Sequence, residues 1–255
     1  MKPVRIAVMA SRRGSNFRSI LDHIRLGVLK GCEVAALVTN RAGCGAVKVA
    51  EEYGVPVLYR PVEGTPLNEW EKGLVDALKD LGVDLLVLAG WDWMVGGTLI
   101  SQFRWRMMAI HPSLHPSFTG TLMRAEEVHR KVLESGVKVT GCTVYYVDSN
   151  VDTGPIIAQR AIKIGRDIYE LFFRDPEAAV SELGRRVLLE EHLLLPKAIQ
   201  LHVEGRIRLF ETEHGTIAVP VYDEDWEEEW ERRQSGYLKV RGLSSPRGVA
   251  QWPSS

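Results

Sequence analysis

Hydrophobic residues in the first sixty positions alternate between short unbroken runs and longer stretches with apolar residues at helical spacing. Val4–Ala10 and Cys32–Thr39 are runs of the kind that form strands buried on both faces. In Asn16–Lys30 the apolar side chains instead recur every three or four positions, which predicts a helix. The same alternation continues with a helix over Ala46–Tyr53 and a strand over Val55–Tyr59.

A helix over Leu67–Leu81 and a continuous apolar run over Asp84–Ala89 complete a βαβαβαβ order. This order is typical of a doubly wound, mostly parallel sheet with helices on both faces, so we predict an α/β, Rossmann-like fold. Such sheets bind their ligands beyond the carboxyl ends of the strands. In this chain those ends are residues 11–16, 39–40, 90–94 and 110–113, and we expect the functional site there.

From Met107 onward the pattern predicts further strands, two helices and a C-terminal extension. Strands are expected at Met107–Ile110, Val139–Val147 and Ile156–Ile164, a helix at Ala125–Glu134 and a long helix at Glu177–His202. Arg206–Phe210 and Thr216–Val221 predict a hairpin, and Asp223–Arg233 predicts a solvated, charged helix followed by a loose tail. We therefore expect an α/β domain over residues 1–210 and an extension with a C-terminal helix and tail over residues 211–255.

Charge and cysteine content narrow the functional class. The formal net charge is −1, which gives no general attraction to nucleic acid or to an anionic membrane. The longest apolar stretch, near Val83–Ala89, is too short to cross a bilayer, and the first residues lack the layout of a signal peptide. Three scattered cysteines have no metal-ligand spacing. We expect a cytoplasmic protein with reduced thiols.

Three polar segments at the expected sheet edge hold the candidate chemistry. Ser11–Asn16 precedes the first helix, where backbone N–H groups favour a phosphate; the alternative is a helix simply capped by Ser15 or Asn16. His111 directly follows a strand and can exchange a proton with a substrate, although a lone histidine is more often structural. Asp152 lies in a segment of turn-forming residues and would raise the pKa of a nearby histidine.

Together these segments resemble the folate-dependent formyltransferases over about Val4–Phe210. The resemblance rests on Gly-Ser-Asn at 14–16, Leu-Ala-Gly at 88–90, Ile-His-Pro-Ser-Leu at 110–114, Gly-Cys-Thr-Val at 141–144 and Val-Asp-Thr-Gly-Pro-Ile-Ile-Ala-Gln at 151–159. It implies transfer of a formyl group from the co-substrate 10-formyltetrahydrofolate to a primary amine, that of glycinamide ribonucleotide in de novo purine biosynthesis. No metal and no covalent intermediate are implied, and a homodimer is left open. A cis bond is implied at His115–Pro116.

The resemblance also implies a role for each matching residue. His111 would be the catalytic histidine, and Asp152 would orient it. Gly14, Ser15 and Asn16 would hold the phosphate of the ribonucleotide, and Glu191 would contact its glycine end. The folate pocket would be lined by Gly90, Trp91, Asp92, Trp93, Met94, Val95 and Ala109.

Several positions depart from the family's pattern. Ala109 stands where the family has an Asn whose amide donates to the developing oxyanion, a loss of about 3 kcal/mol in transition-state stabilisation. Asp92 puts an anion where a cation is usual, Tyr145 replaces a His, and Arg12 replaces a Gly. Segments 120–129 and 165–185 are longer than usual.

These departures keep other functions open. One is a formyltetrahydrofolate hydrolase, although that enzyme usually has an extra N-terminal domain. Another is formyl transfer to an amino sugar nucleotide or to methionyl-tRNA, of which the neutral charge balance argues against the tRNA. The third is a ligand-binding protein that has lost catalysis.

Overall fold

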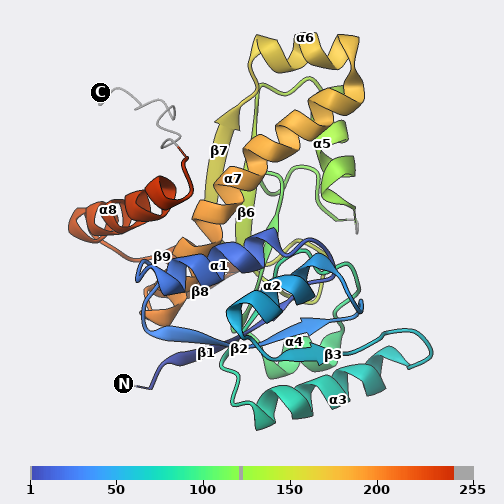
Figure 1. Ribbon diagram of the computed structural model, residues 1–255, viewed down its shortest axis with the longest axis vertical. Coiled ribbons are helices and arrows are strands. Elements are labelled where there is room, and N and C mark those ends of the chain that lie inside the picture. Colours follow the sequence, from blue (N-terminus) through green and yellow to red (C-terminus); the bar gives the residue numbers. More distant parts are fainter. Residues whose placement is uncertain (1, 121–122, 244–255) are drawn as a thin grey trace.

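A seven-stranded sheet forms the centre of the computed structural model, which describes residues 2–120 and 123–243 (Figure 1). The strand order is β3-β2-β1-β4-β5-β6-β7. The first five in this order pair in parallel, whereas β6 and β7 are antiparallel. The strands are β1 (Val4–Met9), β2 (Cys32–Thr39), β3 (Val57–Tyr59), β4 (Leu85–Leu88), β5 (Met107–His111), β6 (Val139–Tyr146) and β7 (Ile156–Lys163). The predicted α/β class with a mostly parallel sheet is confirmed.

Helices cover both faces of this sheet, as the alternation within β1 shows. Ile6 and Val8 pack into a core with α1 (Ser15–Arg25), α2 (Gly45–Tyr53), α5 (Ala125–Glu134) and α7 (Pro176–Val203). Ala7 and Met9 pack into a second core with α3 (Leu67–Asp80) and α4 (Gly97–Gln102). Because successive side chains of a strand point to opposite faces, the two cores lie on opposite sides of the sheet, and the winding is double.

One predicted helix, α1, is shorter than expected, and two helices were not predicted. α1 ends at Arg25 rather than Lys30, because Gly27 adopts a left-handed conformation (φ 67) that stops the helix. The sequence did not predict α4, which is six residues long and begins at Gly97, or α6 (Arg166–Arg174), in which only Ile168 is buried. Within residues 2–120 and 123–243 no helix has the length and apolar character of a membrane span.

The C-terminal part forms the predicted hairpin, β8 (Ile207–Thr212) and β9 (Gly215–Pro220), followed by α8 (Glu224–Val240). The expected boundary between residues 210 and 211 falls inside β8. The prediction of a solvated helix is wrong, because Trp226 and Trp230 are only 7% and 1% exposed. They lie one helical turn apart, on one face of α8. Because most residues between and around them are charged, the sequence does not reveal this apolar face. The expected loose tail includes residues 244–255, which lie outside the described residues.

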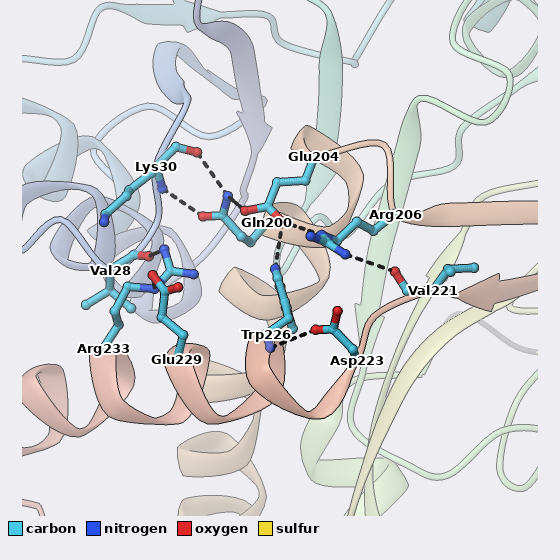
Figure 2. Close-up of polar contacts among 10 residues, drawn as sticks. All are labelled: Val28, Lys30, Gln200, Glu204, Arg206, Val221, Asp223, Trp226, Glu229 and Arg233. Carbon is cyan, nitrogen blue, oxygen red and sulfur yellow. Dashed lines mark hydrogen bonds and ion pairs between the residues drawn. The ribbon is translucent and has the colours of Figure 1, made fainter.

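α8 lies against the turn after α1 and against α7 (Figure 1). Its tryptophans and Tyr237 share a core with Val28 and Leu201. A polar network surrounds this core (Figure 2). Gln200 accepts from the Lys30 N–H at 2.8 Å, Trp226 donates to Glu204 at 2.7 Å, and Arg233 donates to the Val28 carbonyl at 3.0 Å. Asp223 caps the helix by accepting from the Trp226 N–H. The helix is therefore packed against the α/β part of the chain and not exposed on all sides.

Candidate active site at the carboxyl edge of the sheet

One cavity of about 840 Å³ opens at the carboxyl ends of β1, β4 and β5. All 13 residues to which the sequence assigned a role line this cavity. Its walls are formed by residues 12–16, 41, 44–45, 88–95, 109–112, 123–126, 145, 147–152, 188 and 191. The sheet-edge rule therefore located the cavity. In the part of the chain that the structure describes, no three His, Cys, Asp or Glu side chains gather as metal ligands.

The turn before α1 needs glycine for a packing reason. Gly14 has φ 73, and a Cβ there would lie 2.6 Å from the Cα of Ala46 at the start of α2. A Cβ on Gly45 would in turn lie 2.7 Å from the Arg13 carbonyl oxygen. The two helices therefore begin side by side at the cavity. The first N–H groups of a helix have no partner within it, so both starts present donors suited to an anion.

Neither Ser15 nor Asn16 caps α1, contrary to the capping alternative. The helix begins at Ser15 with Gly14 as its cap residue, and no side chain bonds to the cap. The Asn16 side chain instead donates to Glu191 on α7 at 2.6 Å. Its own oxygen is buried and has no partner among the described residues. It is therefore a buried acceptor beside the cavity, without a partner in the described part of the chain.

Glu191 is a buried carboxyl group facing the same end of the cavity. Burial raises the pKa of Glu191 to about 7, although Asn16 and the charge of Arg13 act in the opposite direction. Near neutral pH this carboxyl group is therefore present in both protonation states. It can accept a hydrogen bond from a ligand or donate one to it.

The His111 ring lies between two acceptors. Its Nδ1 is 3.5 Å from Oδ2 of Asp152, and its Nε2 is 3.0 Å from the Phe118 carbonyl oxygen. Both contacts favour the doubly protonated imidazolium. Burial has the opposite and larger effect, so the pKa of His111 is lowered. The charge of Asp152 raises the pKa of this histidine as expected, but the expected net rise is wrong, because the buried imidazole has lost most of its hydration.

Tyr145 lies beside these two residues, and the sequence did not assign it a role. On β6 it is directly opposite Ala109 of β5, and its hydroxyl donates to Asp152 Oδ1 at 2.6 Å. The His115 ring lies 4.7 Å from the Tyr145 ring and 5.2 Å from that of His111. The implied cis bond at His115–Pro116 is confirmed. The sequence marked Tyr145 only as a departure from the family's pattern, and its place beside Asp152 and His111 is not readable before β5 and β6 are paired.

Asp92 does not present an uncompensated negative charge to the cavity. Its carboxylate lies 2.7 Å from Arg41 and 3.7 Å from Arg12, and it accepts from Asn40 at 3.2 Å. Burial alone would raise the pKa of Asp92, but hydrogen bonds involving Ser11, Asn40 and Arg41 outweigh it and the pKa lies below its usual value. The negative charge of Asp92 is thus compensated by arginines from neighbouring strand ends.

The rest of the 90–95 loop offers an apolar surface. Gly90 has φ 78, and Trp91 packs with its ring centre 5.8 Å from that of Trp70. Trp93 and Met94 are 44% and 54% exposed. Because these side chains line the cavity while open to solvent, they can pack against a flat aromatic ligand.

Comparison with known proteins identifies a family that matches most of the chain. The profile of the formyl transferase family matches residues 4–199. The chain is 37% identical over 210 residues to the chloroplastic phosphoribosylglycinamide formyltransferase of Arabidopsis thaliana, covering 80% of this chain and 67% of that protein. It is 33% identical over 212 residues to the human trifunctional purine biosynthetic protein adenosine-3, covering 82% of this chain but 19% of that one.

Among solved structures, the fold is similar to glycinamide ribonucleotide transformylase 1 from Symbiobacterium toebii. The TM-score is 0.76 at 35% identity, and the match covers 87% of this chain and 95% of that chain. The likeness therefore extends over nearly the whole length of this bacterial structure as well as part of longer proteins.

Proposed function

This chain belongs to the formyl transferase family, and we propose that it transfers the formyl group of 10-formyltetrahydrofolate to the amine of glycinamide ribonucleotide in purine biosynthesis. The observation that carries the proposal is the shared cavity. His111 and Asp152, the turn at Gly14 and the apolar loop at Trp93 all line it. A proton-transfer pair, an anion site and an aromatic surface are what this reaction requires.

We assign His111 to proton transfer during the reaction. The amine nitrogen attacks the formyl carbon, and the carbonyl oxygen becomes an oxyanion. Collapse of this intermediate breaks the bond from the formyl carbon to N10 of the folate, which leaves with a proton. A neutral His111 takes the proton released by the amine, and Asp152 and the Phe118 carbonyl stabilise the imidazolium. The same proton then passes to N10, so the ring returns to its starting state.

The remaining roles follow from the walls of the cavity. Backbone N–H groups at Gly14, Ser15 and Asn16 hold the phosphate of the ribonucleotide at the start of α1. Glu191, which Asn16 holds by a hydrogen bond, contacts the glycine end of the same substrate. Residues 90–95 and Ala109 hold the folate, and Arg41 receives its acidic tail.

We place this activity in the cytoplasm, with small molecules as the only reaction partners and no metal requirement. The Arabidopsis relative is chloroplastic, so fractionation of cells that express the protein tests the compartment directly. Activity that survives dialysis against a chelator supports the metal-free reaction. Light scattering on the purified chain distinguishes a monomer from a homodimer.

The deciding experiment measures turnover of 10-formyltetrahydrofolate by the purified protein with glycinamide ribonucleotide, with an amino sugar nucleotide, or with water alone. We expect stoichiometric tetrahydrofolate and formylated ribonucleotide only in the first reaction. Equal turnover in water would identify a hydrolase. Folate binding by calorimetry without turnover in any reaction would identify a binding protein.

A further inference from the structure

Tyr145, Ala109 and His111 share one face of the paired strands β5 and β6. Ala109 is directly opposite Tyr145, and His111 is directly opposite Thr143. Opposite residues of an antiparallel pair have their side chains on the same face, and so do residues two apart along one strand. The Tyr145 side chain therefore projects beside the small Ala109 methyl group and toward the part of the cavity that holds His111.

The Asp152 carboxylate connects this tyrosine to the histidine. One oxygen, Oδ1, accepts from the Tyr145 hydroxyl at 2.6 Å, and the other, Oδ2, lies 3.5 Å from His111 Nδ1. All three side chains are largely buried, with Asp152 and His111 at 12% and 9% exposure. Burial first, and the charge of Asp152 second, hold the pKa of Tyr145 well above its usual value. The phenol is therefore a permanent donor across the physiological pH range.

Asp152 depends on this donor because its own loop does not fix the carboxylate. Its backbone has φ 58, a left-handed conformation that is uncommon for residues other than glycine. The neighbouring Asp148 accepts from the Asn150 N–H and the Thr153 hydroxyl and so organises the rest of the turn. Among residues 2–120 and 123–243, the Tyr145 hydroxyl is the one hydrogen-bond donor to the Asp152 carboxylate.

We propose that Tyr145 is a positioning residue for the reaction: its hydroxyl fixes Asp152 Oδ1 so that Oδ2 faces His111 Nδ1. Tyr145 thereby determines how strongly the imidazolium is stabilised when His111 takes up the proton of the amine. The effect on turnover rests on the proposed formyl transfer. The effect on the titration of His111 does not, and it tests the positioning role by itself.

Two other histidines lie close enough to His111 to affect its pKa. His115 faces both the His111 and Tyr145 rings, and His129 of α5 is close enough for its charge to oppose that of His111. Burial lowers the pKa of each to about 4. Both are therefore neutral near pH 7, and Asp152 is the carboxylate that faces the His111 ring.

The test compares Tyr145→Phe with Tyr146→Phe. Tyr146 is the next residue on β6, is also buried, and also loses one hydroxyl hydrogen bond, to His202 at 2.7 Å, but it does not line the cavity. We expect Tyr145→Phe to lower kcat about tenfold with KM changed about twofold or less, whereas Tyr146→Phe leaves both unchanged. Thermal unfolding of both variants measures the loss of stability that is common to them.

Two further measurements separate positioning from a merely structural role. Histidine NMR should give a lower His111 pKa in Tyr145→Phe than in the parent or in Tyr146→Phe, because the Asp152 charge moves away from Nδ1. In the background of Asp152→Asn, adding Tyr145→Phe should cost no further activity.

An unchanged or raised His111 pKa in Tyr145→Phe would overturn the positioning role. So would additive effects of Tyr145→Phe and Asp152→Asn on kcat. A parent protein without transfer activity would overturn the proposed function instead, and the NMR titration would still decide the role of Tyr145.

Discussion

Ala109 and Tyr145 face each other across β5 and β6, so two departures from the family's pattern are one structural change. The large side chain of Tyr145 occupies the space beside the small side chain of Ala109. We predict that Ala109→Asn alone gains no activity and loses about 1–3 kcal/mol of stability, because the added amide is overpacked against the phenol.

The double variant Ala109→Asn with Tyr145→His should have a higher kcat than either single variant, because the smaller ring leaves room for the amide to reach the oxyanion. The coupling should amount to about 0.5–3 kcal/mol. Steady-state kinetics and thermal unfolding of the parent, both singles and the double variant measure it. Strictly additive changes would mean that the two positions act independently.

Burial of the His111 ring decides the pH range in which the site works. Because its pKa is lowered from 6.5, the ring is neutral and able to accept a proton at pH 7. We predict that kcat/KM falls on the acid side, below pH 6.5, as His111 becomes protonated in the free enzyme. A profile of kcat/KM that instead falls as pH rises from 6 to 8 would mean that the protonated ring is the active form.

At the scale of elements, α8 contributes to stability and not to the cavity. Trp230 is 1% exposed and stacks on Trp226 with ring centres 5.9 Å apart. We predict that Trp230→Ala lowers the free energy of unfolding by about 3–5 kcal/mol. Its kcat should remain that of the parent, because none of the described residues lining the cavity belongs to α8. Trp93→Ala, at a 44% exposed position, is the matched control and should cost about 0.5 kcal/mol or less.

The elements that the sequence predicted are those with strong apolar periodicity. Cys32–Thr39 is a strand in the structure with the predicted limits, because a run buried on both faces has one compatible conformation. α6 was missed because most of it is exposed, and the burial of Trp226 depends on a surface formed by Val28 and α7. The hydrophobic pattern of a single segment does not predict such contacts with distant segments. The division into residues 1–210 and 211–255 stays a prediction.

The location of the candidate site could be predicted, because the sheet topology brings its residues together. Gly14, His111 and Asp152 come from distant segments, and the carboxyl-edge rule was enough to bring them to one cavity. The charge states were not predictable. Whether burial or Asp152 dominates the pKa of His111 depends on the surrounding packing, and the neutralisation of Asp92 depends on the course of the chain at Arg41.

For the whole molecule, buried histidines predict sensitivity to acid. Burial lowers the pKa of His23, His129, His192 and His202 from 6.5 to about 4. Between these values the unfolded chain binds more protons than the folded one. The stabilisation is therefore complete above pH 6.5 and is lost as pH falls toward 4, by roughly 3 kcal/mol per histidine. Glu191, with its raised pKa, has the opposite sign but is a single group.

Thermal unfolding at pH 7.5, 6 and 5 should accordingly show a falling Tm. His129→Leu removes one buried titrating group and should make the fall less steep. A Tm that is constant over this range would mean that these histidines keep access to water in the folded protein.

The side-by-side starts of α1 and α2, where Gly14 lies against Ala46 and Gly45 against Arg13, also affect how fast a ligand arrives. Each helix start carries a partial positive charge of about half a unit, and arginines stand next to both. The molecule as a whole has a net charge of −1, so attraction of a phosphate-bearing substrate has to come from these local charges and not from the net charge. Added salt screens such an attraction. We predict that kcat/KM for glycinamide ribonucleotide falls with ionic strength while kcat does not. The close contact of two glycine turns would then govern diffusional capture as well as the bound state.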